Sequence, residues 1–148
     1  MNIYLHVEVS VRELDSKLLL AVLAASKGHQ VILSSMGEII KGLKMGALTP
    51  GIFHTKSLTP SKSKIKRHQQ IIDTNSIVTC IDEEHGLFIE GYDQFAVDRY
   101  SDKSIEQSSA VFGWGFEDTE TLKRIYSKNS QKIHKTGSPR VDLWKSIF

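Results

Sequence analysis

Apolar residues recur along the chain in two patterns that predict different elements. In residues 3–9, the sequence IYLHVEV places an apolar side chain at every second position, which is typical of a strand with one buried face. Later short apolar runs, bounded by turn-forming residues, predict further strands. The predicted strands cover residues 3–9, 30–35, 51–55, 76–82, 109–115 and 132–137.

Stretches with helical character separate these strands. The first begins at Ser10, where Glu13 completes a Ser-x-x-Glu capping box, and Gly28 ends it. Alternation of strand and helix is typical of a parallel sheet covered on both faces, so we predict an α/β, Rossmann-like, three-layer domain with a mostly parallel sheet of about six strands. The predicted helices cover residues 10–27, 37–46, 60–75, 92–100 and 117–129.

The first predicted helix is apolar nearly all round. Leu19, Leu20 and Leu23 lie outside the stripe that is expected to pack on the sheet. They would contact either neighbouring helices of the same domain or a partner domain or subunit. The stripe expected to face the sheet consists of Leu14, Leu18, Val22 and Ala25.

Composition excludes several classes of protein. A chain of 148 residues with 40% hydrophobic and 24% charged residues is typical of one globular domain. The net charge of +2 does not indicate a nucleic-acid-binding protein. Cys80 lies in an apolar run and is expected to be a buried, inert thiol. Residues 1–15 lack the pattern of a signal peptide, and the longest apolar run, residues 18–25, is too short to span a bilayer. We expect a cytoplasmic protein.

Polar segments follow the predicted strands and could form a site. Because ligands bind outside the carboxyl ends of the strands in an open parallel sheet, these segments are predicted to converge at one edge. They are SVRELDS at 10–16, DEEHG at 82–86, GWGFED at 113–118 and TGSPR at 136–140.

The first segment carries three candidate groups. Arg12 could hold a phosphate or carboxylate through its planar guanidinium group, or it could form a surface ion pair with Asp15. Glu13 could belong to the capping box, pair with Lys17 at i+4, or act as a base toward a sugar hydroxyl.

The second segment places Asp82, Glu83, Glu84 and His85 in succession after an apolar strand. Mutual repulsion of the carboxylates would raise one pKa and suit acid–base chemistry. Successive residues of an extended chain point to opposite sides, so they form a poor metal site, and we predict none. A solvated turn is the simpler interpretation.

The other two segments combine glycine with a potential ligand contact. Trp114 offers a stacking face beside Gly115, or it fills a hole at the end of the sheet. Gly137 permits a tight turn before a helix in which Ser138 is a suitable cap and Pro139 a suitable first residue. Arg140 in the first turn of that helix would complete an anion site.

A basic stretch opens the third predicted helix. Lys62, Lys64, Lys66 and Arg67 form either a solvated face or a peripheral contact with anionic lipid head groups or a phosphate-bearing acceptor. The stretch lacks the interleaved aromatic residues of a nucleic-acid-stacking surface, so no nucleic-acid partner is predicted.

Together, these segments resemble a bacterial family of surface carbohydrate biosynthesis proteins, which are similar to two-domain glycosyltransferases of the GT-B type. The TG-x-P-x-x-D turn also resembles that of the non-hydrolysing UDP-N-acetylglucosamine 2-epimerases. The family usually has asparagine at the position of Ser138. The matching residues are Arg12, Glu13, Leu14 and Asp15; Asp82, Glu83 and Glu84; Trp114 and Gly115; and Gly137, Pro139, Arg140 and Asp142.

The resemblance implies a function for each group of residues. Residues 1–137 would be the N-terminal, acceptor-binding half of a GT-B fold, and residues 138–148 would begin a linker helix to a second domain, missing here or separately encoded. Glu13, Asp15 or Glu83 would be the base, while Arg12 and Arg140 would face negative charge on a carbohydrate acceptor or a nucleotide-sugar donor. No other cofactor is implied, and activity is not expected without the second domain. An epimerase-like enzyme half and a non-catalytic sugar- or phosphate-binding module are the alternatives.

Overall fold

The computed structural model describes residues 1–84 and 91–145, which form an α/β domain built on a parallel sheet. All neighbouring strands pair in parallel, in the order β2-β1-β3-β4-β5-β6. The order reverses between β1 and β3, which is where such sheets open a crevice for ligands. The predicted fold class is confirmed. The strands are β1 (Asn2–His6), β2 (Gln30–Ser34), β3 (Ile52–Thr55), β4 (Ile77–Ile81), β5 (Ala110–Gly113) and β6 (Ile133–Lys135).

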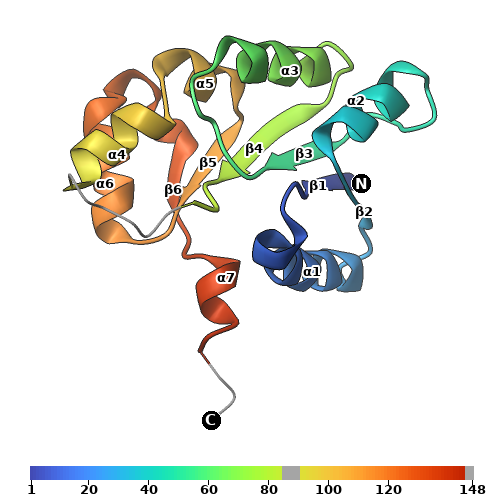
Figure 1. Ribbon diagram of the computed structural model, residues 1–148, viewed down its shortest axis with the longest axis horizontal. Helices are drawn as coiled ribbons and strands as arrows, with labels where there is room; N and C mark the ends of the chain where they lie inside the picture. The colour runs from blue at the N-terminus through green and yellow to red at the C-terminus, as the bar shows by residue number, and fades with distance from the viewer. Residues whose placement is uncertain (85–90, 146–148) are drawn as a thin grey trace.

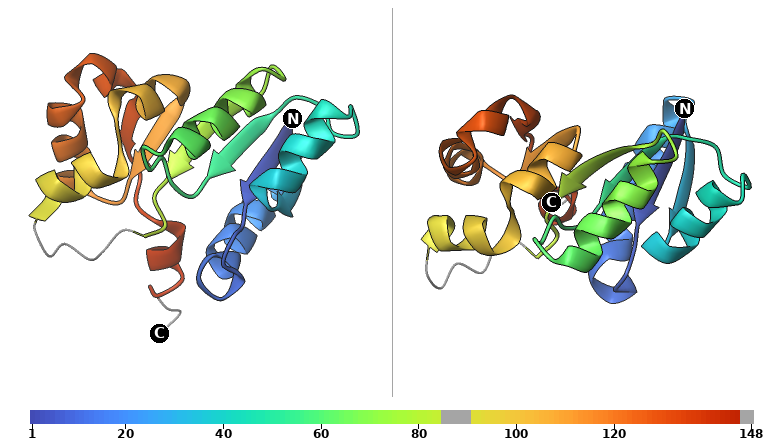
Figure 2. Two further views of the ribbon diagram at one scale, coloured as in Figure 1. Left: turned by 45° about the horizontal axis from the view of Figure 1, so that its top comes forward. Right: turned by 90° about the horizontal axis from the view of Figure 1, so that it is seen from above.

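Helices cover the two faces of the sheet unequally (Figures 1 and 2). One face carries α1 (Ser10–Ser26) and the short α7 (Pro139–Asp142). The sequence pattern did not predict α5 (Asp102–Gln107), although Ser101 and Ser104 form a capping box there. The opposite face carries α2 (Met36–Lys44), α3 (Lys62–Ile72), α4 (Gly91–Arg99), α5 (Asp102–Gln107), α6 (Phe116–Ile125) and the 3₁₀ helix η1 (Ser127–Lys132).

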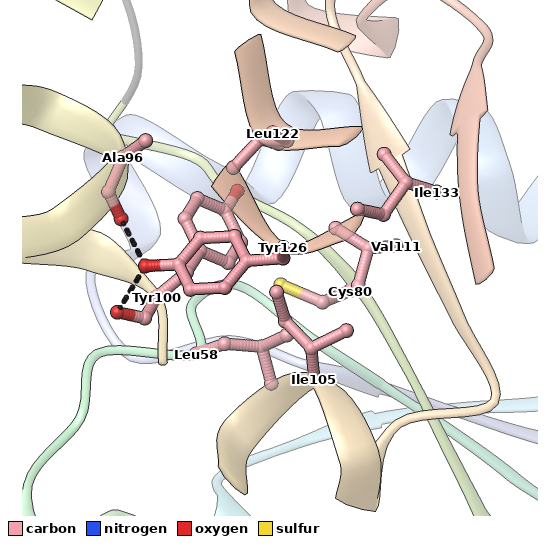
Figure 3. Close-up of a cluster of buried hydrophobic side chains, with 9 residues drawn as sticks. All are labelled: Leu58, Cys80, Ala96, Tyr100, Ile105, Val111, Leu122, Tyr126 and Ile133. Carbon is pink, nitrogen blue, oxygen red and sulfur yellow. Dashed lines mark hydrogen bonds between the residues drawn. The ribbon is translucent and has the colours of Figure 1, made fainter. Parts of the chain in front are cut away.

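The hydrophobic core lies on the face with the larger number of helices. Tyr4, Phe53 and Val78 pack against α2 and α3, and Figure 3 shows the adjoining cluster around Cys80 and Tyr126. The buried Tyr126 hydroxyl donates to the carbonyl oxygens of Ala96 and Tyr100. Cys80 is fully buried and free, as predicted, and burial raises the pKa of its thiol.

The predicted inward stripe of α1 is wrong. Leu14, Leu18 and Val22 are 36%, 45% and 65% exposed, and Ala25 is exposed as well. The buried side chains of the helix are instead Glu13, Ser16 and Lys17. Charged residues face inward because they find charged partners at the carboxyl edge of the sheet, as described below. The leucine-rich surface is therefore left outward.

The sheet face between α1 and α7 is only partly covered. It borders a cavity of about 450 Å³ with a mainly apolar lining that includes Leu5, Ile81 and Phe112. The ring of His54 lies on this face, and its Nδ1 is 3.0 Å from Thr79 Oγ1. Within residues 1–84 and 91–145, no helix has both the length and the hydropathy needed to cross a bilayer.

Three of the described histidines, His6, His54 and His68, are buried, and they should make the domain sensitive to mild acid. Burial lowers the pKa values of His6 and His68 from 6.5 to about 4. The unfolded chain therefore binds more protons than the folded chain between these values, so stability should fall as the pH drops from 6.5 to 4, by up to about 3 kcal/mol for each histidine. Urea unfolding of His68→Met at pH 7.5 and 4.5 should show a smaller acid loss than the wild-type protein. His134→Met, at an exposed position, is the control. Equal acid losses in both variants would contradict the interpretation.

Candidate functional site

Segments that are distant in sequence meet at the carboxyl edge of the sheet. Arg12 Nη2 lies 3.1 Å from Glu84 Oε1. Trp114 Nε1 donates to the carbonyl oxygen of Asp82 at 2.9 Å. Arg140 Nη1 donates to the carbonyl oxygen of Glu83 at 3.3 Å. The predicted convergence of the RELD, DEE, GWG and TGSPR segments is confirmed, and its cause is that all their preceding strands run in the same direction.

Glu13 is the most heavily bonded carboxylate of this edge. Its Oε2 accepts from the backbone N–H groups of Glu8 and Val9 at 2.8 and 3.2 Å. Its Oε1 accepts from Arg12 Nη2 at 3.0 Å and Lys56 Nζ at 3.1 Å. Burial would raise the pKa of Glu13, but these donors outweigh it and lower the pKa to about 2. A carboxylate with all these acceptor positions filled anchors the start of α1, and it is a weak base at neutral pH.

The predicted capping box forms only in part. Val9 occupies the cap position of α1, and no side chain caps the helix there. Glu13 nevertheless reaches back to backbone N–H groups before the helix, as the acidic member of such a box does. Its contacts are with Arg12 and Lys56, whereas Lys17 pairs with Glu83.

Lys56 is a site residue that the sequence analysis did not assign to the edge. It directly follows β3, its side chain is 5% exposed, and its Nζ lies 2.6 Å from Glu8 Oε2 and 3.1 Å from Glu13 Oε1. Burial would lower the pKa of Lys56, but the two carboxylates outweigh it and raise the pKa. The signal for finding it was available, because it is the polar residue at the carboxyl end of a predicted strand.

Arg99 at the end of α4 is the second residue that was missed. Its Nε and Nη2 each donate to a different oxygen of Asp82 at 2.9 Å, and its Nη1 donates to Glu84 Oε2 at 2.7 Å. Burial raises the pKa of Asp82, and Arg99 offsets part of that effect. Burial would also raise the pKa of Glu84, but Arg99, Arg12 and Lys56 lower it. No local pattern marks Arg99, because it ends a helix rather than following a strand.

Lys17 and Glu83 form a buried ion pair behind this edge. Lys17 Nζ lies 2.8 Å from Glu83 Oε1, and the two side chains are 0% and 2% exposed. Among the described residues neither atom has a partner in hydrogen-bonding geometry, so the pair is held by charge attraction. Glu83 is therefore enclosed, while Glu84 is the member of the DEE segment with a partly exposed carboxylate.

A hydrogen bond to Asp118 and the close packing at Gly113 fix the backbone of the GWG segment. The backbone N–H of Trp114 donates to Asp118 Oδ2 at 2.8 Å. A Cβ at Gly113 would lie 2.3 Å from Thr119 Oγ1, so this position is closed to larger residues. Gly115 has an extended backbone and open space around it. Trp114 is half-buried.

The TGSPR turn brings Arg140 to the edge. Gly137 has a φ of +100°, a left-handed conformation that favours glycine. Ser138 occupies the N-cap position of α7 and Pro139 opens the helix, as predicted, but the Ser138 side chain forms no capping hydrogen bond among the described residues. The Ser138 hydroxyl is buried without a partner among the described residues. Arg140 also lies over the Trp144 ring, 5.7 Å from its centre.

Other predicted residues lie apart from these contacts. Asp15 is exposed, and within the described chain Arg12 pairs with Glu13 and Glu84 rather than with it. His85 lies outside the described residues, which contain no group of three metal-binding side chains suited to hold an ion. In the basic stretch, Lys62, Lys66 and Arg67 are exposed.

The resulting site, named here the edge network, alternates cations and carboxylates at the carboxyl ends of β1, β3 and β4. Its partly exposed groups, Arg12 and Glu84, can exchange their mutual contact for contacts with a polar ligand, while the buried members hold them in position. Such a surface suits hydroxyl-rich molecules. The chain matches no protein-family model, no curated protein and no solved structure. The edge network consists of Glu8, Arg12, Glu13, Lys17, Lys56, Asp82, Glu83, Glu84 and Arg99.

Proposed function

We propose that this chain is the acceptor-binding domain of a glycosyltransferase-like protein that assembles a bacterial surface polysaccharide. The observation that carries the proposal is the meeting of the RELD, DEE, GWG and TGSPR segments through direct contacts at one edge. These are the segments on which the resemblance to surface carbohydrate biosynthesis proteins rests. In the proposal, the nucleotide-sugar donor binds to a second domain, in the same polypeptide or separately encoded.

The contacts favour a division of roles among the candidate residues. Glu84 and Arg12 would hydrogen-bond acceptor hydroxyls, and Trp114 would contact a sugar ring. Glu83 and Glu13 are enclosed, so positioning fits their surroundings better than proton transfer. Asp15 remains a candidate base because it is exposed. The predicted catalytic roles of Glu13, Asp15 and Glu83 therefore remain predictions.

A binding experiment tests the proposal. The ¹⁵N-labelled chain is titrated with neutral oligosaccharides that contain N-acetylhexosamine and, separately, with UDP-N-acetylglucosamine. We expect saturable amide shifts at Glu84, Trp114 and Gly115 with the oligosaccharide. Glu84→Gln should weaken this binding about tenfold, because it removes a charged hydrogen-bond acceptor. Arg124→Gln, on the exposed side of α6, should leave it unchanged.

The result with the nucleotide sugar separates the alternatives. Binding of UDP-N-acetylglucosamine alone, with shifts at the same amides, would contradict the acceptor assignment and favour an epimerase-like half. A non-catalytic binding module is the second candidate, favoured by the extensive internal pairing of the carboxylates. It predicts oligosaccharide binding but no sugar transfer when the second half is supplied.

A further inference from the structure

A second, smaller cavity lies beside the edge network. Its volume is about 120 Å³, below the range of sites for drug-sized ligands and suited to a small polar group. It lies at the first turns of α2 and α3, on the face of the sheet opposite α1. Its lining comprises His6, Met36, Ser61, Ser63, Lys64 and Arg67, with Glu8.

The charge around this cavity is unbalanced. The first six residues of α3 contain Lys62, Lys64, Lys66 and Arg67, and its first turn has no acidic residue. Cations at the positive end of a helix dipole are unfavourable unless an anion is present. Burial, followed by the charges of Lys56 and Arg99, lowers the pKa of Lys64.

Hydrogen-bond donors also face the cavity. His6 is 5% exposed, and its only hydrogen-bond contact among the described residues is a long one, 3.5 Å from Nδ1 to Thr55 Oγ1. Because the Thr55 hydroxyl donates to the carbonyl oxygen of Ser57, Nδ1 of His6 is the donor in this contact, and its other ring nitrogen is an acceptor. Lys64 Nζ donates to Ser57 Oγ at 3.2 Å and retains further protons to donate. Glu8 lines the same cavity, but its carboxylate is paired with Lys56.

We infer that this cavity binds one phosphate group, presented by a soluble phosphomonoester or by the head group of a phospholipid. Lys64 and Arg67 supply the positive charge, Ser63 supplies a neutral donor, and the N-terminus of α3 supplies a favourable dipole. The inference does not depend on sugar transfer, because it rests on residues other than the partly exposed groups of the edge network.

Two charge-matched double variants test the inference. Lys64→Gln/Arg67→Gln removes two cations from the cavity lining, and Lys62→Gln/Lys66→Gln removes two cations from the same helix outside the lining. Inorganic phosphate and glucose 1-phosphate are titrated at constant ionic strength, with sodium chloride as the reference salt. The readouts are the amide shifts of Ser63 and Lys64 and the ring signals of His6. Phosphatidylcholine vesicles with and without phosphatidic acid provide the lipid test.

We expect saturable amide shifts with the soluble phosphates. The affinity should fall at least about tenfold in Lys64→Gln/Arg67→Gln, the lining pair, and less than about twofold in Lys62→Gln/Lys66→Gln, the control pair. Because Lys64 also contacts Ser57, Arg67→Gln is measured alone and should weaken binding in the same direction. Binding only to vesicles with phosphatidic acid, lost in the lining pair alone, would support a lipid-borne phosphate. Equal losses of phosphate affinity in the two double variants would identify a diffuse basic surface and overturn the inference. So would chloride producing the same shifts, or the absence of binding to every probe.

Discussion

Lys17→Met should lower the free energy of unfolding by about 3 to 5 kcal/mol, because it leaves the buried carboxylate of Glu83 without its counter-charge. Replacing both partners, in Lys17→Met/Glu83→Leu, should recover most of this loss. Apolar residues of similar volume often replace a buried ion pair at little cost. Urea unfolding followed by far-ultraviolet circular dichroism at pH 7.5 measures both changes.

The exposed Lys41 on α2 offers a matched control for this substitution. Lys41→Met should change the free energy of unfolding by less than about 0.5 kcal/mol, since surface substitutions usually do. A Lys17→Met variant as stable as Lys41→Met would refute the buried pair. A double variant no more stable than Lys17→Met would mean that the loss comes from packing rather than from unpaired charge.

Glu13→Gln should cost about 3 kcal/mol at pH 7, even though it keeps the size and shape of the side chain. In the variant, the side-chain NH₂ group of glutamine would replace one carboxylate oxygen. It would then face N–H donors that it cannot accept from. Because the pKa of Glu13 is lowered from 4.5 to about 2, its stabilising effect is complete above pH 4.5 and is lost as the pH falls through 2. Glu13→Gln should therefore unfold with a weaker pH dependence than the wild-type protein between pH 4.5 and 2.

The same measurements separate an anchoring role from a catalytic one. Glu38→Gln, at an exposed position in the first turn of α2, is the control and should cost only a few tenths of a kcal/mol. If Glu13 is a base rather than an anchor, Glu13→Gln will be as stable as Glu38→Gln. In that case its effect would appear only in sugar transfer by the assembled protein.

Much of the fold could be predicted from the sequence because strand signals are local. Every predicted strand is present, although the structure shortens most of them by a residue or more at their ends. The convergence of the Asp82 and Trp114 segments followed from topology alone. The helix α5 was missed because its six residues are too few for an apolar period to be visible.

The side chains of the site were predicted less completely. Arg12, Glu84 and Arg140 were named correctly as members of one edge, but their partners were not. Lys56, although it follows a predicted strand, and Arg99 were not assigned to the edge, because each lies within a segment that resembles an ordinary solvated surface. Burial, which distinguishes them, depends on contacts between distant parts of the chain.

The sequence by itself determined the strands, most of the helices, the parallel direction of the strands and therefore the edge at which polar segments gather, because hydrophobic periodicity and strand–helix alternation act over a few residues. Only the tertiary structure decided which side of α1 faces inward. Apolar periodicity favoured Leu14 and Leu18, but Glu13 and Lys17 turn inward, where they meet Lys56 and Glu83. The physical reason is that a buried charge is tolerated only where an opposite charge lies within reach, and Lys56, the buried partner of Glu13, lies 43 residues away along the chain.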